Sequence, residues 1–191
     1  MGARAEPEDG ATGPYSEPWR FPIRFRALTI LACSLFAAHG AVAAPPVAET
    51  EVAGSVVRVR FAGPVDDGQA PAFVDWLQAV ATNVSSVYGR FPIPRLTVVV
   101  DARYRYGRDD DSPVPFGRVR RRGGETVELF VDPQRPIEDF YADWTATHEF
   151  SHLLLPAISW KHRWVSEGFA SYYQNVLMAR AGNYTTATAI R

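Results

Sequence analysis

The chain has 191 residues, of which 47% are hydrophobic and 13% aromatic, and its formal net charge at pH 7 is −1. A chain of this length and composition can bury one hydrophobic core, so we expect one folded domain. A nearly neutral chain has no electrostatic attraction for polyanions, so we expect no nucleic-acid partner.

The N-terminal segment has the layout of a signal peptide. Residues 27–38 are apolar and follow three arginines: Arg20, Arg24 and Arg26. The apolar stretch is shorter than a typical membrane span, and small residues around Ala43 and Ala44 supply a cleavage site. We therefore predict a signal peptide over residues 1–44 and a secreted or periplasmic mature domain over residues 45–191. Cleavage would leave no stable membrane association, whereas an uncleaved segment would anchor the protein.

Cys33 is the only cysteine, and it lies inside this predicted signal peptide. Without cysteine, the mature domain has no disulfide, no thiolate nucleophile and no cysteine ligand for a metal. Any metal site must therefore be built from histidine and carboxylate side chains.

The first half of the mature domain alternates predicted strands with a helix. β-Branched residues predict a strand over residues 52–61, and an apolar run predicts a buried strand over residues 96–100. Apolar residues at three-to-four spacing predict a helix from Pro71 to Tyr88. Further along, Gly123-Gly124 predicts a tight turn between two strands.

Two charged clusters each have a structural and a functional interpretation. Asp109-Asp110-Asp111 lacks the spacing of a calcium loop, so we interpret it as a solvated acidic loop and assign no second metal.

Four arginines crowd the predicted hairpin: Arg118, Arg120, Arg121 and Arg122. We favour an edge strand that charge protects from pairing with other sheets. The alternative is recognition of an acidic substrate or a terminal carboxylate.

A metal-binding pattern follows. Residues 148–152 read His-Glu-Phe-Ser-His, and the absence of Pro and Gly over residues 141–155 predicts one continuous helix. Residues four apart share a helix face, so His148 and His152 can bind one ion while Glu149 projects towards a metal-bound water. Glu167, on a second helix, is the natural third ligand of a His-His-Glu site with an open fourth position.

Two segments together resemble the gluzincin metallopeptidases, most closely the glycyl aminopeptidase family. They are His-Glu-Phe-Ser-His-Leu at residues 148–153 and Trp-Val-Ser-Glu-Gly-Phe-Ala-Ser-Tyr-Tyr at residues 164–173. The resemblance implies an α+β, thermolysin-like N-terminal catalytic lobe, with a small mixed sheet and zinc-bearing helices. It also implies Zn²⁺ held by His148, His152 and Glu167, with Glu149 as general base.

The same resemblance indicates a residue behind the metal ligands. Gluzincins often place a carboxylate seven residues after the glutamate ligand, where it orients a zinc histidine. That position here is Gln174, whose amide oxygen can accept the same N–H bond.

The sequence therefore predicts a zinc-dependent peptidase that cleaves peptide or protein substrates through a Glu149-activated, zinc-bound water. The alternative is a non-catalytic zinc-binding module that recognises peptides, or an incomplete peptidase lobe. Gluzincins generally carry a second oxyanion donor well downstream of the glutamate ligand, so we expect the chain to be part of a longer protein. The sequence leaves open endopeptidase or aminopeptidase action and the oligomeric state.

Overall fold

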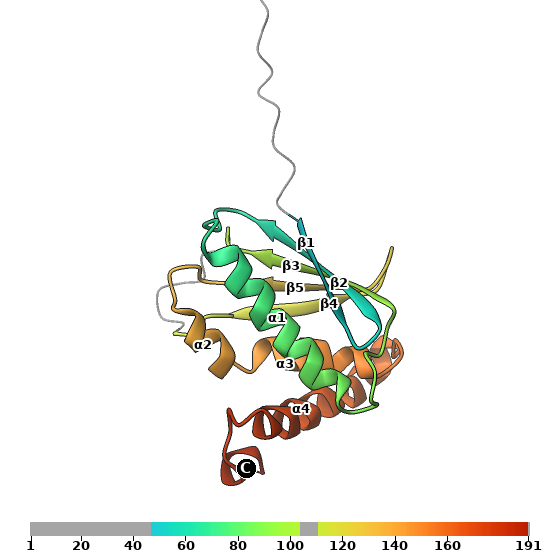
Figure 1. Ribbon diagram of the computed structural model, residues 1–191. Helices are drawn as coiled ribbons and strands as arrows, with labels where there is room; N and C mark the ends of the chain where they lie inside the picture. Colours follow the sequence, from blue (N-terminus) through green and yellow to red (C-terminus); the bar gives the residue numbers. More distant parts are fainter. Residues whose placement is uncertain (1–46, 104–110, 191) are drawn as a thin grey trace, which may run out of the picture. The chain divides into compact units, whose positions relative to one another are not determined.

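The computed structural model describes residues 47–103 and 111–190, which form a five-stranded mixed sheet and several helices (Figure 1). The sheet has the strand order β1-β2-β3-β5-β4. Its strands are β1 (Val47–Val52), β2 (Ser55–Ala62), β3 (Arg95–Asp101), β4 (Phe116–Arg120) and β5 (Thr126–Phe130). This architecture is consistent with the expected α+β class.

Both edges of the sheet are antiparallel hairpin arms, and its centre is parallel. β1 pairs with β2 and β4 pairs with β5 in antiparallel fashion, while β3 runs parallel to both β2 and β5. The predicted turn between β4 and β5 is confirmed, because Gly123 and Gly124 both adopt positive φ, at 79° and 116°. These angles lie in the region that favours glycine.

The helices are α1 (Gln69–Ser85), α2 (Ile137–Ala142), α3 (Thr145–Ser151), α4 (Arg163–Arg180) and α5 (Thr186–Ala189), with 3₁₀ turns η1 (His152–Leu154) and η2 (Trp160–His162). α1 makes the crossover between parallel strands β2 and β3 and lies across one face of the sheet (Figure 1). α3 packs against α1, against the edge strand β4 and against α4. The metal motif is thus held between the sheet edge and the last long helix.

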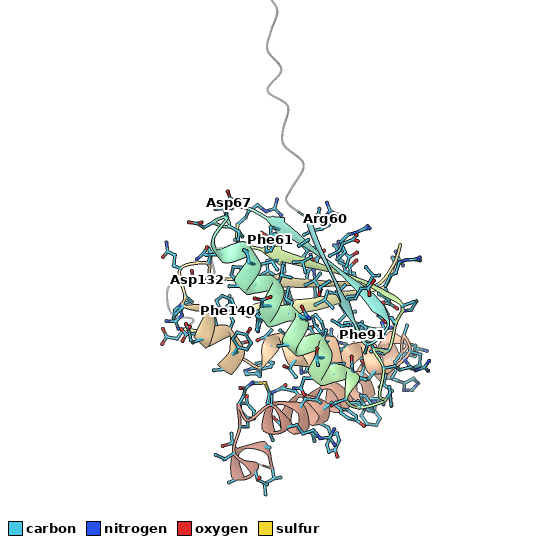
Figure 2. All side chains as sticks on the ribbon, in the orientation of Figure 1. Arg60, Phe61, Asp67, Phe91, Asp132 and Phe140 are labelled. Atoms are coloured by element: carbon cyan, nitrogen blue, oxygen red, sulfur yellow. The ribbon has the colours of Figure 1, made fainter. Side chains whose placement is uncertain are left out.

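An aromatic cluster anchors the helices on the sheet. Phe73 and Trp76 of α1 contact Phe140 of α2 edge-on, with ring centroids 5.0 and 5.2 Å from that of Phe140, which is labelled in Figure 2. Phe150 of α3 is fully buried, and its ring centroid lies 6.4 Å from that of Phe91. Burial of a large aromatic side chain stabilises the fold by about 1.5–3 kcal/mol, so Phe150 fixes α3 firmly in the core.

The strand predicted over residues 52–61 is confirmed as β2 with a later start, at Ser55, whereas its hairpin partner β1 was not predicted. Ala53 and Gly54 form the turn between them, both at positive φ, 47° and 81°. Alanine rarely adopts this conformation, which explains why the turn escaped prediction. The predicted helix from Pro71 to Tyr88 is confirmed with shifted ends, beginning at Gln69 and ending at Ser85.

The continuous helix predicted over residues 141–155 is wrong. Asp143 is extended, with φ −77° and ψ 138°, and separates α2 from α3. Its carboxylate accepts a hydrogen bond at 2.8 Å from the backbone N–H of Thr145, which satisfies an unpaired donor at the start of α3. The chain then tightens into η1 at His152. The metal motif therefore begins on an α-helix and ends on a 3₁₀ turn.

Several sequence predictions lie outside the described residues. These are the signal peptide over residues 1–44, its Cys33, and most of the acidic run Asp109-Asp110-Asp111, of which only the exposed Asp111 is described. In the part of the chain that the structure does describe, no helix is both long enough and apolar enough to cross a membrane.

Candidate metal centre

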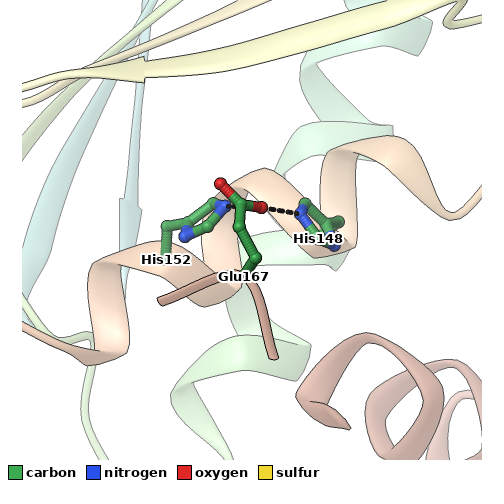
Figure 3. A group of neighbouring side chains, drawn as sticks. All are labelled: His148, His152 and Glu167. Atoms are coloured by element: carbon green, nitrogen blue, oxygen red, sulfur yellow. Dashed lines mark ion pairs between the residues drawn. The ribbon is translucent and has the colours of Figure 1, made fainter. Parts of the chain in front are cut away.

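The three side chains predicted to bind a metal converge on one point (Figure 3). The Nε2 atoms of His148 and His152 lie 3.4 and 3.5 Å from the same oxygen, Oε2 of Glu167. All three candidate ligand atoms lie within 4.8 Å of one another. α3 and η1 supply the two histidines, and α4 brings the glutamate against them.

These distances fit a small divalent cation. Ligands bound tetrahedrally at about 2.0–2.1 Å from zinc lie about 3.4 Å apart, which matches both distances to Oε2 of Glu167. Two imidazoles and one carboxylate form a donor set typical of catalytic zinc. The residues present therefore fit a zinc ion.

The hydrogen bonds behind the histidines point their ring nitrogens at the same position. His148 Nδ1 lies 3.0 Å from Oε1 of Gln174, and since an amide oxygen only accepts, Nδ1–H donates. In neutral His148 the lone pair on Nε2 then faces the Glu167 carboxylate. His152 Nδ1 lies 3.0 Å from Oγ of Ser166. The two Nε2 lone pairs and Oε2 of Glu167 repel one another without a cation, whereas a cation between them would be bound by all three atoms.

The charge states suit metal binding. Burial lowers the pKa of His152 to about 4, and His148 acts in the same direction, so His152 is neutral at pH 7. Burial raises the pKa of Glu167, but the hydrogen bond from Arg163 and the nearby His152 outweigh it and hold that pKa below its usual range. Glu167 is therefore a carboxylate at neutral pH.

Glu149 occupies a different environment from Glu167. Its side chain is buried, with a relative exposure of 9%, and it lines a pocket of about 960 Å³. Burial raises the pKa of Glu149 to about 7, the charge on Glu167 adds to this, and Arg163 opposes it. A carboxylate with a pKa near neutrality can both accept and donate a proton at physiological pH.

The pocket lies between the sheet edge and the metal motif. β4 forms one wall with Phe116, Gly117, Arg118 and Val119, while α3, η2 and α4 contribute Trp144, His148, Glu149, Trp160, Arg163 and Glu167 among others. β4 is hydrogen-bonded to β5 on one side only, so its other edge faces this pocket. The candidate ligands and Glu149 are therefore open to an incoming molecule.

Three of the four hairpin arginines, Arg118, Arg120 and Arg121, have partners within the fold. Arg118 and Arg120 both form ion pairs with Glu128 of β5, at 2.5 and 3.1 Å. Arg121 donates hydrogen bonds to the backbone oxygens of His152 and Leu155, at 2.7 and 2.9 Å. These contacts favour the structural interpretation of the cluster over anion recognition.

Sequence reasoning missed three contributors to the site: Gly117, Arg163 and Ser166. Arg163 precedes Glu167 by four residues, which is the spacing of a helical ion pair and a usable signal. Ser166 and Gly117 carried no such signal, because their roles depend on how η1 and β4 pack against neighbouring segments.

Comparisons with known proteins give a distant likeness. No protein-family model matches the chain, and no curated protein matches it. Among solved structures, an aminopeptidase N family protein from Idiomarina loihiensis is similar, with 16% sequence identity and a TM-score of 0.49. The similarity covers 73% of this chain and 26% of that protein, so the chain spans about a quarter of its length.

Proposed function

We propose that the protein is a zinc-dependent peptidase of the gluzincin type, with His148, His152 and Glu167 as zinc ligands and Glu149 as general base. One observation carries the proposal: three candidate ligand atoms lie within 4.8 Å of one another beside a buried carboxylate in an open pocket. A purely structural zinc site has no use for a carboxylate beside an accessible coordination position. The proposal rests on this chemistry and not on the distant structural likeness.

The chemistry divides between the ion and the chain. Bound zinc supplies a Lewis acid that polarises a carbonyl and makes water more acidic. Glu149 accepts a proton from the attacking water as the new C–O bond forms, and it later delivers that proton to the leaving nitrogen as the C–N bond breaks. The raised pKa of Glu149 suits both steps, because neither protonation state is strongly preferred near pH 7.

The open edge of β4 suggests how a peptide binds. Gly117, Arg118 and Val119 of this strand line the pocket, and an extended peptide can pair with their backbone N–H and C=O groups. Such pairing provides affinity without depending on substrate sequence, and the pocket side chains then provide selectivity. We propose this strand as the arm of the hairpin that aligns the substrate.

The location of the enzyme outside the cytoplasm is a further part of the proposal. The predicted signal peptide at residues 1–44 would place the domain at residues 45–191 outside the cytoplasm, where it would meet peptide or protein substrates. A cysteine-free site of histidines and carboxylates suits an oxidising compartment, because it contains no thiol to oxidise.

Metal content and peptide hydrolysis, measured together, test the proposal. The wild-type chain and Glu149→Gln should each contain about one zinc per chain, because Glu149 is not a ligand in the proposed site. Hydrolysis of a mixed pool of quenched fluorescent peptides should fall by about 10²–10⁴-fold in Glu149→Gln. Stoichiometric zinc with no hydrolysis in either protein would favour the non-catalytic peptide-recognition module, and a wild-type chain without zinc would contradict both functions.

A further inference from the structure

The two oxygens of the Glu167 carboxylate have separate partners. Oε2 faces the Nε2 atoms of His148 and His152, whereas Oε1 accepts a hydrogen bond from Nε–H of Arg163 at 2.8 Å. Glu167 is 39% exposed and would otherwise rotate in solvent. The contact with Arg163 therefore selects which oxygen is presented to the histidines.

Arg163 is itself held in place. It is the first residue of α4 and lies one helical turn before Glu167, so both side chains lie on the same face. Its guanidinium lies over the ring of Trp160 in η2, 5.0 Å from the ring centroid. This stacking restricts a long side chain that is 58% exposed. Trp160 thus restricts Arg163, and Arg163 in turn orients Glu167, although neither Trp160 nor Arg163 belongs to the His-Glu-Phe-Ser-His motif.

We propose that Arg163 is a positioning residue that holds Glu167 as a ligand through one oxygen and thereby strengthens zinc binding. This inference rests on the proposed metal site. Holding the carboxylate in advance removes conformational freedom that binding would otherwise have to remove.

Two effects of Arg163 on zinc affinity oppose each other. Its positive charge repels a cation, but solvent screens that repulsion because the guanidinium is largely exposed. The Nε–H group of Arg163 donates at 2.8 Å to Oε1 of Glu167, in the same carboxylate that supplies the candidate ligand atom Oε2. Groups that orient metal ligands typically change affinity by about 10–100-fold, so the orienting effect outweighs the screened repulsion.

Zinc dissociation constants of the full chain, measured by competition with a chromophoric chelator, test the inference. Arg163→Gln should bind zinc about 10-fold more weakly than wild type. Arg163→Lys should lie between them, because lysine keeps the charge but loses the planar Nε–H donor. Arg60→Gln is the charge-matched control, since Arg60 lies on β2 away from the site, and it should bind as wild type does. With Co²⁺ in place of zinc, the visible absorption band should shift in Arg163→Gln, which a purely long-range charge effect would not cause.

The outcomes separate the inference from the proposed function. Zinc binding by wild type with equal or tighter binding by Arg163→Gln would overturn the role of Arg163 and leave the metal site standing. A wild-type chain that binds no zinc would overturn both. The metal-free variants should unfold at the same urea concentration as metal-free wild type. If Arg163→Gln does not fold, Arg163→Lys decides the inference by the same titration.

Discussion

The backbone of Gly117 lies directly against the side chain of Glu149. A β-carbon on Gly117 would lie 2.5 Å from Cγ and 3.2 Å from Oε1 of Glu149, well inside normal contact distances. A side chain on β4 at this position would therefore force Glu149 to move. Glycine is required here by the contact with Glu149 and not by a positive φ, which Gly117 does not have.

Replacing Gly117 with alanine should displace Glu149 and lower peptide hydrolysis by about 10²-fold, because misplacing a reacting group by about 1 Å has an effect of this size. Zinc content should stay at the wild-type level, since the three atoms nearest the added β-carbon all belong to Glu149, which is not a ligand in the proposed site. Steady-state hydrolysis and metal analysis on the same preparation check both statements.

Gly168→Ala is the matched control for that experiment. Gly168 lies next to the candidate ligand Glu167 on α4, yet a β-carbon there would meet no atom within 4 Å. The substitution should leave hydrolysis unchanged and, as a glycine-to-alanine change within a helix, raise the free energy of unfolding by up to about 1 kcal/mol. Equal activity of Gly117→Ala and Gly168→Ala would contradict the expected loss of activity from misplacing Glu149.

The candidate metal ligands and the supporting residue Gln174 were predictable from sequence, whereas Asp143 and Gly117 were not. His148 and His152 are four residues apart, so helical periodicity alone places them on one face. Asp143 was not recognised as a helix break, although aspartate favours helix ends and its bond to Thr145 spans only two residues. Gly117 is separated from Glu149 by more than thirty residues. No local pattern predicts such a contact.

Gln174 should contribute to zinc affinity through His148. Gln174→Leu removes the acceptor of the Nδ1–H bond, so the ring loses its orientation and zinc should bind about 10-fold more weakly. Gln174→Glu keeps an acceptor and adds a negative charge that makes the imidazole more basic, so zinc should bind at least as tightly as in wild type. Chelator competition measures both constants. Equal affinity of the leucine variant and wild type would contradict this role.

Removal of zinc from the proposed site should lower the thermal stability of the domain, because the three candidate ligands join α3, η1 and α4. A metal present at about 100 times its dissociation constant stabilises the folded state by about 2.7 kcal/mol. For a chain of this size that corresponds to about 5–10 °C in Tm. Circular dichroism melts before and after chelation, and after zinc is restored, measure the change. His152→Ala should show no response to chelation or to added zinc.

Arg121 should stabilise the end of the metal motif. Its guanidinium donates to the backbone oxygens of His152 and Leu155, where the helical turn ends, and the His152 oxygen also accepts from the backbone N–H of Leu155 at 3.3 Å. Arg121→Met should lower the free energy of unfolding by about 1–3 kcal/mol, since two acceptors lose a charged donor. The exposed neighbour Arg122 supplies the control, and Arg122→Met should change stability by less than about 0.5 kcal/mol. Urea denaturation of both variants distinguishes a specific bond from a general loss of positive charge.

The carboxylate of Asp101 at the end of β3 should make stability depend on pH. The side-chain hydrogen bond from Arg103 lowers the pKa of Asp101 below its usual value, although burial acts in the opposite direction. A lowered folded-state pKa stabilises the protein fully above the unfolded-state value of about 3.9, and this stabilisation is lost as the pH falls towards the folded-state pKa. Urea denaturation should therefore show wild type more stable than Asp101→Asn at pH 7, with the difference shrinking below about pH 4. In an Arg103→Gln background, replacing Asp101 with Asn should change stability less, and the change should depend less on pH, because the side-chain donor that lowers the pKa of Asp101 is gone. A gap between wild type and Asp101→Asn that stays constant down to pH 3 would contradict a lowered pKa of Asp101 in the folded protein.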